Sequence, residues 1–470
     1  MKKGALQRLD FSGPLEAAGF VLLTGFAALA PLVHAVTESA RLAIGGGAPP
    51  AQEGYLLAFC AFTIAAIIFL SGFRSHTVRL AAVPLAATAL LAFLGVVQLL
   101  PVPETVLARI APVNLRIYHE TAQILDVFGR RDSPAVRISI APEETVYVVL
   151  LLLSSAALFL AAAQILTNRP RRRFFASVLC ASALAHVLLG IARSGSLEER
   201  LRGAFANPNH FGAYLGIVLA IAFAALWTEM LRDSDAGSSD PGVGMEKRLL
   251  RLGARFVVWA GILAGILLTR SRGAILAAAV TTVVLFVLGT RHRRARSRRP
   301  ALAAAGAAGI LVVLIVAAAG FFLRFGDTDP RDLGSDTRVR LWETSLQAWR
   351  QFPVVGSGLG AFPEAFRRVQ PRELNFLVEH AHSDPLQLLV TGGSIGAALG
   401  ALLFVSLFVL LLRAWRRQKH REESAFAFAG IGALLSVTLH GLVEFNFSIP
   451  VIPATLACVL GAAWAAAPDR

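Results

Sequence analysis

The sequence predicts an all-α polytopic membrane protein with about 12 transmembrane helices and a large outward-facing loop between spans 9 and 10. The first observation is composition: 56% of the 470 residues are hydrophobic and the mean hydropathy is +0.63, which does not describe a soluble globular protein. The second is a series of apolar runs, each close to the roughly 20 residues that a spanning helix needs. The third is the placement of positive charge between those runs.

The apolar runs follow one another along a single integral membrane domain that covers residues 1–470. They lie at 16–36, 55–72, 80–100, 145–166, 174–192, 210–231, 252–269, 273–290, 301–323, 385–412, 424–442 and 449–467. The seventh has a short apolar core, so it either crosses the membrane or is re-entrant. The first is longer than the apolar core of a signal peptide, which favours an uncleaved span. Cys60, Cys180 and Cys458 fall inside runs, where cysteine is usually a small buried hydrophobe.

Positive charge is concentrated in the segments that would face the cytoplasm. With both termini inside, these short segments hold 26 of the 45 lysine and arginine residues, including every lysine, as the positive-inside rule requires. The net charge of +15 therefore reflects topology and gives no reason to expect nucleic acid as a partner. The outward-facing basic residues are all arginine, which suits contacts with phosphate or carboxylate groups, although an arginine-rich composition explains the same observation.

Two outward-facing segments are too long to be simple turns, namely residues 101–144 and residues 324–384. We expect function to lie there, and part of the active site in the second. In that loop, apolar residues recur at helical spacing: Val339, Trp342, Leu346 and Trp349. The spacing predicts an amphipathic helix along the membrane surface. The same stripe would also serve simply to pack the loop onto the helix bundle.

Glycines mark two further features of this region. In "GSGLGAF" (356–362) they predict a tight turn, because no strand precedes them as a dinucleotide-binding fingerprint would require. Gly392, Gly396 and Gly400 repeat every four residues, which allows another helix to approach closely.

The stretch "HAHSDPLQLLVTGGSIG" (380–396) places titratable residues at the start of the tenth run. Ser383 or Asp384 suits the N-cap and Pro385 the first turn, so His382 is predicted just outside the helix N-terminus. The positive end of a helix dipole disfavours imidazolium, so this histidine would stay neutral and able to act as a base. A ring that only caps backbone groups is the alternative interpretation.

Two other outward-facing sites also place polar side chains at predicted helix ends. "TRSRGA" contributes Arg270 and Arg272, which either anchor lipid phosphates or form part of a buried anion site. "RLRGAFANPNHFGAYL" contributes Arg202, Asn207, Asn209 and His210, although Asn-Pro is also an ordinary turn former. Together these residues gather arginine, asparagine and histidine on one side of the membrane without an acidic cluster for a metal.

Four segments, in order, resemble the O-antigen ligase and polymerase superfamily of bacterial envelope glycan transferases. They are "GAFANPNHFGAYL", "TRSRGA", "DTRVRLW" with the later "PVVGSGLGAF", and "HAHSDPLQLLVTGGSIG". The last is the most specific, because the family pattern of His, then Asn, Ser or Gln, nine residues, Gly, two residues and Gly is met by His382, Ser383, Gly393 and Gly396. "RISIAPEET" and "HGLVEFNFSIP" are similar to family segments with less specificity. Asp384-Pro385 departs from the pattern, in which an aromatic residue more commonly follows the Asp.

The resemblance implies a glycosyltransferase that moves a glycan from undecaprenyl diphosphate to an acceptor hydroxyl. The reaction would take place at the periplasmic face of the bacterial inner membrane, among membrane lipids, with inversion and without a metal or cofactor. The family's catalytic histidine maps onto His382, and its two arginines map onto Arg272 and Arg338. Further candidates for substrate binding are Arg202, Arg270, Asn207, Asn209 and His380.

The sequence leaves the acceptor open. Lipid A-core would make the protein a ligase, another carrier-linked repeat would make it a polymerase, and a protein side chain would make it an O-oligosaccharyltransferase. A lipid or solute transporter is an alternative from another class, because 12 spans are also common in transporters. Transporters tend to place binding groups near the midplane of the bilayer and to contain internal repeats, and neither feature is visible here.

Overall fold

The computed structural model describes residues 9–43, 51–72, 81–129, 135–195, 199–231, 241–291, 335–418 and 420–467. Within these ranges the regular structure is helical, with one isolated β-bridge between Pro101 and Arg137 and no strand. The ninth predicted span, 301–323, and the beginning of the second long loop lie outside these ranges.

Nine helices within the described ranges are long and apolar enough to cross a membrane, so the chain is a multi-pass membrane protein. They belong to α1 (Pro14–Ala43), α4 (Ala82–Leu99), α7 (Pro142–Ile165), α8 (Arg169–Arg193), α9 (Pro208–Met230), α10 (Pro241–Leu268), α11 (Arg272–Arg291), α15 (Asp384–Arg417) and α16 (Arg421–Gly441). Two shorter apolar helices, α2 (Ala51–Ser71) and α17 (Val451–Ala465), coincide with the second and twelfth predicted runs. The total of 12 spans stays a prediction.

The seventh predicted run is part of a continuous helix. α10 extends over 28 residues and contains a candidate span at Met245–Leu268. No re-entrant turn interrupts it, so of the two interpretations of this run the structure favours the crossing helix.

Asparagine begins two of the long helices. The side chain of Asn207 accepts a hydrogen bond from the backbone N–H of Asn209 at the start of α9 (2.8 Å), and Asn168 accepts one from Arg171 at the start of α8 (2.9 Å). In both helices a proline occupies the first turn, where its missing N–H would have had no partner. These caps fix where each helix leaves the loop before it.

α9 lies at the centre of the bundle, where it packs against α16, α10 and α11. Small residues let the helices approach closely. Gly212 of α9 lies against Ala274 of α11, and Gly216 lies against Ser436 of α16. The helix is therefore shielded from lipid on nearly all sides, and 89% of its apolar segment is buried inside the protein.

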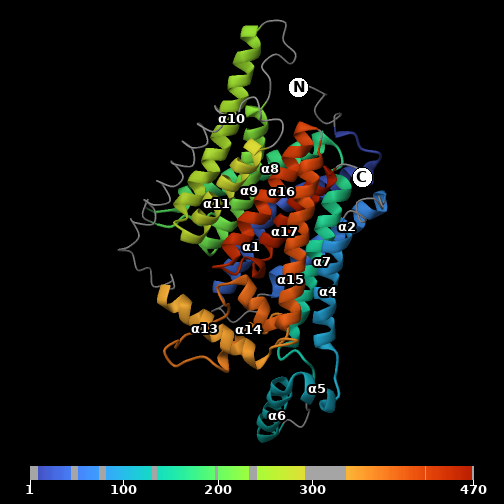
Figure 1. The fold of residues 1–470 in the computed structure, drawn as a ribbon, viewed down its shortest axis with the longest axis vertical. Helices are drawn as coiled ribbons and strands as arrows, with labels where there is room; N and C mark the ends of the chain where they lie inside the picture. The colour runs from blue at the N-terminus through green and yellow to red at the C-terminus, as the bar shows by residue number, and fades with distance from the viewer. Residues whose placement is uncertain are drawn as a thin grey trace.

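The helix ends form two groups at opposite ends of the bundle (Figure 1). One group contains the starts of α8, α1 and α16, joined by ion pairs of Arg171 with Glu16 (2.7 Å) and Arg169 with Glu423 (3.1 Å). The other contains the starts of α9 and α15 and the end of α16. Four further helices lie beyond the second group: α5 (Glu104–Ile110), α6 (Pro112–Val127), α13 (Ser335–Gln351) and α14 (Phe362–Arg367).

The amphipathic helix predicted in the second long loop is α13, and half of the predicted stripe is partly buried. Trp342 and Trp349 are half-buried, and Trp349 packs against a small core. Leu341 and Ala348 are buried in a small core with α14, whereas Val339 and Leu346 of the predicted stripe are exposed. Leu341, Ala348 and Trp349 therefore pack the loop onto the bundle, in the same core as Val390 of α15. Contact of the exposed stripe with the membrane surface stays a prediction.

α15 is kinked at Gly393, which has φ +63° and ψ −167°. The kink leaves backbone groups without helical partners, and the loop that contains "GSGLGAF" satisfies them. The N–H of Gly358 donates to the carbonyl of Thr391 (3.1 Å). Gly356 has φ +77°, and a Cβ there would collide with the Thr391 carbonyl. The predicted tight turn is confirmed, and its glycines are needed for this close approach.

Two of the three glycines in the repeat around the kink pack against another helix, as predicted. Gly392 and Gly396 lie near the side chain of Leu94 on α4, whereas Gly400 meets Leu388 of its own helix. The first two glycines therefore admit a neighbouring helix, and the third makes room within α15.

Candidate active site

Glu444 is the centre of a buried polar cluster at the end of the bundle where α9 and α15 begin. It lies between α16 and α17, and its side chain is only 1% exposed. Its Oε1 accepts hydrogen bonds from Nδ2 of Asn209 (2.6 Å) and Nη2 of Arg338 (3.1 Å). Its Oε2 lies 3.3 Å from Nδ1 of His382. One carboxylate thus joins the starts of α9, α13 and α15.

His382 occupies the predicted position just before α15, with Ser383 as the N-cap. Its φ of +48° is uncommon for a residue with a Cβ, and such conformations are concentrated at functional sites. Nε1 of Trp342 on α13 donates to its carbonyl (3.3 Å). The ring is 22% exposed and its Nδ1 faces Glu444. This nitrogen therefore does not cap the helix backbone, which was the alternative role.

Asp384 fastens the Glu444 loop to the start of α15. Its two carboxylate oxygens accept hydrogen bonds from the backbone N–H groups of Asn446 (3.1 Å) and Phe447 (3.2 Å), and its own N–H donates to the carbonyl of Glu444 (3.0 Å). Of the two residues suited to the N-cap, Ser383 holds the position without a side-chain capping bond. Asp384, which precedes the departure from the family pattern at Pro385, therefore positions the loop that carries Glu444.

Three histidine rings surround the side chain of Phe445. His380 stacks on it with ring centroids 4.0 Å apart, while His382 and His210 meet it edge-on at 4.8 Å and 4.6 Å. Nδ1 of His380 also lies 3.3 Å from Oε1 of Gln387. Phe445 thus contacts all three rings and favours one orientation of each, as edge and stacked aromatic contacts do.

The Glu444 carboxyl is ionised at neutral pH. Burial raises its pKa, but the imidazoles of His382, His210 and His440 oppose that effect and lower the pKa to about 2. A negative charge therefore lies beside the His382 ring, where it favours a tautomer with the proton on Nδ1.

Several buried polar atoms around Glu444 have no protein hydrogen-bond partner. They are Nδ1 of His382, Oε2 of Glu444, Nε of Arg338, both ring nitrogens of His440, and both side-chain polar atoms of Asn446. Buried groups are normally satisfied, and a concentration of exceptions is typical of a place where water or a ligand binds. The cluster therefore has hydrogen-bonding capacity that the protein itself does not use.

The structure brings Asn209 and Arg338 to Glu444, but it separates Arg202 and Asn207 from that carboxylate. Arg202 is 51% exposed and pairs with Glu199 (3.4 Å), and Asn207 caps α9 as described above. Arg200 takes the place that the sequence suggested for Arg202, because its Nη2 donates to Oδ1 of Asn209 (2.7 Å).

Arg270 and Arg272 lie at the turn between α10 and α11. Arg270 has φ +51°, and Arg272, the first residue of α11, is exposed. The next residue, Gly273, lies directly against His440. The backbone of this turn therefore borders the cluster, and the Arg272 side chain starts beside it.

Sequence reasoning missed Glu444, Arg200 and Phe445. The signal for Glu444 was present in "HGLVEFNFSIP", a segment with only weak family likeness, in which a lone carboxylate stands among apolar residues near a predicted helix end. A buried carboxylate needs partners, so that position was a candidate for pairing with one of the arginines.

No group of three or more metal-ligating side chains occurs among the described residues. The carboxylate of Glu444 is bonded to Asn209 and Arg338, and that of Asp384 is bonded to backbone N–H groups. The residues of the cluster that the structure describes are arranged as partners of one another.

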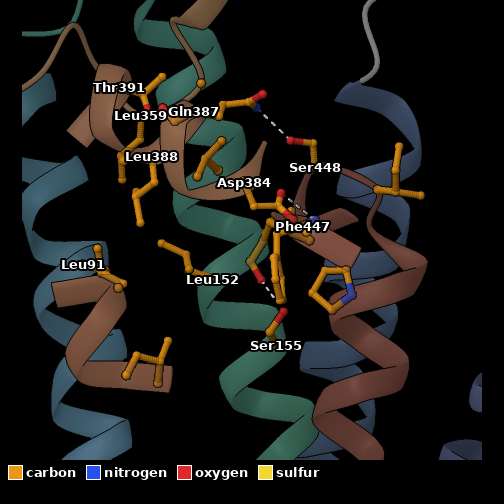
Figure 2. Close-up of a pocket in the computed structure, with 18 of the residues that line it drawn as sticks. Leu91, Leu152, Ser155, Leu359, Asp384, Gln387, Leu388, Thr391, Phe447 and Ser448 are labelled. Carbon is orange, nitrogen blue, oxygen red and sulfur yellow. Dashed lines mark hydrogen bonds between the residues drawn. The ribbon is translucent and has the colours of Figure 1, made fainter. Parts of the chain in front are cut away.

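A cavity of 730 Å³ lies beside the cluster, and His380, whose ring stacks on Phe445, is part of its wall. His380, Asp384 and Gln387 line it, whereas His382, Arg338 and Glu444 do not. Figure 2 shows Gln387 bonded to Ser448 and Asp384 bonded to Phe447, with Leu91, Leu152 and Leu388 around the apolar part (2.9 Å for the first bond). The site therefore consists of a charged cluster and an adjacent, mainly apolar cavity.

The fold and this cluster define a multi-pass helical membrane protein with a buried acid, histidine and arginine at one end of its helices. Residues 256–401 match the family model described as O-antigen ligase. This match supports membership of the O-antigen ligase superfamily, as the motifs predicted. No curated protein matches the sequence.

Proposed function

We propose that the protein transfers a glycan from undecaprenyl diphosphate to an acceptor hydroxyl, as an O-antigen ligase does. The family match supports glycan transfer in general. The observation that carries the proposal is the contact of His382 with Glu444 and of Glu444 with Arg338, because it combines a general base with cations suited to a diphosphate leaving group. These groups lie at helix ends, which favours an enzyme over a transporter with a site at the midplane.

In this mechanism His382 removes the proton of the acceptor hydroxyl. Glu444 faces Nδ1 at 3.3 Å, so Nε2 is left for the acceptor. The two atoms are close without an aligned hydrogen bond, and catalytic hydrogen bonds often tighten only when the substrate binds. The acceptor oxygen attacks the anomeric carbon of the sugar as its proton passes to Nε2. The bond from that carbon to the diphosphate oxygen breaks, and one displacement inverts the configuration.

The leaving diphosphate gains negative charge, and the arginines stabilise it. Arg338 has a buried Nε with no partner, so it can donate to a phosphate oxygen while Nη2 stays on Glu444. Arg272 begins on the same side of the cluster and can place its planar guanidinium on the diphosphate. Charge stabilisation of this kind is among the largest contributions to catalysis.

We further propose that this end of the bundle faces the periplasm of a bacterial inner membrane, because the opposite group of helix ends adjoins the arginine-rich segments that also hold every lysine. Ser357 in the second loop is buried, so a labelling experiment needs the exposed Glu373. A cysteine at position 373 should react with an impermeant reagent in cells whose inner membrane is intact. Reaction only after that membrane is opened would reverse the orientation.

Deletion of the gene tests the function and separates the acceptors. Long glycans left on the carrier lipid would indicate a ligase, single repeats would indicate a polymerase, and loss of glycoprotein alone would indicate a protein O-oligosaccharyltransferase. The ligase result is the expected one. Unchanged glycans of every class would contradict glycan transfer.

A further inference from the structure

Trp342 of α13 holds the backbone of His382. Its Nε1 donates to the His382 carbonyl (3.3 Å), and no backbone N–H of the described residues donates to that oxygen. His382 has φ +48°, a conformation that a residue with a Cβ seldom adopts without support from its surroundings. The indole N–H is therefore part of what keeps the backbone of this histidine in the left-handed region.

The residues on either side of His382 are held by other contacts. The N–H of Ala381 donates to a side chain of α15 (3.2 Å), and the N–H of Asp384 donates to the carbonyl of Glu444 (3.0 Å). These bonds fix the neighbours, whereas the Trp342 bond is made to His382 itself. Loss of the indole N–H should therefore release the His382 ring while the start of α15 stays in place.

The same helix carries the cation of the cluster. Arg338 lies one turn before Trp342, and its Nη2 donates to Oε1 of Glu444 (3.1 Å). Leu341, between them in the chain, is fully buried in a core that α13 shares with α14 and α15. α13 lies beyond the end of the bundle (Figure 1), so its position on this core sets the Arg338 guanidinium and the His382 carbonyl together.

We infer that Trp342 is a positioning residue for the base, because its N–H fixes the orientation in which His382 presents Nε2 to the acceptor hydroxyl. Treating His382 as the base rests on the proposed function. Through this bond α13 also keeps the base and the Arg338 cation at a fixed separation. Proton removal and departure of the diphosphate belong to one displacement, so both groups must be in place at once, and a misplacement of about 1 Å can cost on the order of 10²-fold in rate.

Trp342→Phe tests the role of the N–H. Phenylalanine keeps an aromatic face, which is what stacking on a sugar ring would use, but it has no group that donates to a carbonyl. If Trp342 positions His382, the variant should reduce kcat by up to about tenfold, as loss of one hydrogen bond does, with the KM values for donor and acceptor unchanged. An unchanged kcat with a higher KM would make the indole a substrate contact and refute the inference.

Trp349 provides a matched control on the same helix. It lies two turns after Trp342, is also half-buried, and its Nε1 donates to the carbonyl of Pro353 (3.2 Å). Trp349→Phe makes the same change in volume and removes the same kind of bond, so it should lower the thermal stability about as much without reducing kcat per folded molecule. An equal loss of kcat in both variants would show a general loosening of α13 and no specific hold on His382.

Chemical modification tests the hold on the ring without relying on activity. The full-length protein in lipid nanodiscs is treated with diethyl pyrocarbonate, which acylates neutral imidazole, and modified peptides are quantified by mass spectrometry. His382 is 22% exposed, so its modification rate should rise several-fold in Trp342→Phe and stay at the wild-type value in Trp349→Phe. The exposed His119 of α6 is the internal reference. An unchanged rate at His382 in Trp342→Phe would contradict the inference.

A double variant separates this inference from the proposed function. In the His382→Ala background, Trp342→Phe should change the residual rate by less than about twofold, because the ring that it positions is absent. A second loss of about tenfold there would show that Trp342 acts on something other than His382. Near-normal turnover of His382→Ala alone would contradict the proposed function, and the modification rates would still decide whether Trp342 holds the histidine.

Discussion

Two arginine–glutamate clusters at opposite ends of the helices, Arg171 with Glu16 and Arg338 with Glu444, differ in how completely they are bonded. At the first, Arg171 is 2% exposed. Its guanidinium donates to Glu16 (2.7 Å), to the carbonyls of Leu9 (2.7 Å) and Ile165 (3.1 Å), and to that of Asp10. Each of its three nitrogens therefore has a protein acceptor, and the pair joins α8 to the start of α1.

At the second cluster, the same kind of ion pair is left incomplete. Arg338 bonds Glu444 through Nη2, but its Nε, Oε2 of Glu444 and Nδ1 of His382 have no completed hydrogen bond. Unsatisfied buried groups are costly in a low dielectric, so such an arrangement persists only where the surrounding packing holds it. The comparison indicates that a cluster whose polar groups are all hydrogen-bonded holds helices together, whereas a cluster with unused donors and acceptors can bind a ligand.

The largest expected loss of turnover is at His382, which belongs to the second cluster. If His382 is the base, His382→Ala should reduce turnover by about 10²–10⁴-fold, the usual range for a positioned general base. Binding of the carrier lipid should stay nearly unchanged, because the arginines remain. Single-turnover rates and donor binding are measured on folded, purified protein. Near-normal turnover with protein matched to wild type would return His382 to a structural role.

The position of His382 was predictable and its partner was not, for a physical reason. Helix starts depend on local residues, so Pro385 and the apolar run after it fixed where α15 begins. The choice of Arg200 over Arg202 depends on how a loop turns above α9, and the role of Glu444 depends on segments distant in the chain. Apolar runs in the same way predicted the helices within the described ranges, whereas the buried face of α13 depended on its neighbours.

The arginines come next in expected effect. Arg272→Ala and Arg338→Ala should each weaken donor binding and reduce turnover, by up to about 10²–10³-fold, and lysine should restore activity only in part because it lacks the planar fork. Arg338→Ala should also destabilise the protein, since it leaves Glu444 with one partner fewer. Isotherms for carrier-lipid diphosphate and rates provide the test. The exposed Arg116 of α6 is the control, and a loss at Arg116→Ala of similar size would refute a specific site.

Replacing Glu16 and Glu444 by glutamine should distinguish a role in stability from a role in catalysis. Glu444→Gln should reduce turnover about 10–100-fold, the range for residues that orient a functional group. Glu16→Gln should leave the rate per folded molecule unchanged but destabilise the protein by about 3–5 kcal/mol, because Arg171 stays buried without its anion. Thermal unfolding and rates of both variants are compared. The opposite pattern, with Glu16→Gln slow and Glu444→Gln merely unstable, would invert the comparison.

A smaller difference is expected between the arginines that precede α9. Arg200→Ala removes the donor to Oδ1 of Asn209 and should reduce turnover several-fold by loosening the Glu444 carboxylate. Arg202→Ala removes an exposed ion pair with Glu199, and such pairs contribute only about 0–1 kcal/mol. Steady-state rates at matched protein levels distinguish them. A larger loss at Arg202 would show that the sequence-based choice was right and that Arg200 is structural.

The smallest expected effect is that of a chelator. The open groups of the second cluster are nitrogens and oxygens that a divalent ion could also bind, so their incompleteness has two explanations, a metal or a substrate. Glu444 is bonded to two cationic or amide donors and no ligand group of three is formed within the described ranges, which favours the substrate. EDTA should therefore leave transfer by the purified protein intact. Loss of activity that magnesium or manganese restores would assign the open bonds to a metal and remove the arginines from their role on the leaving group.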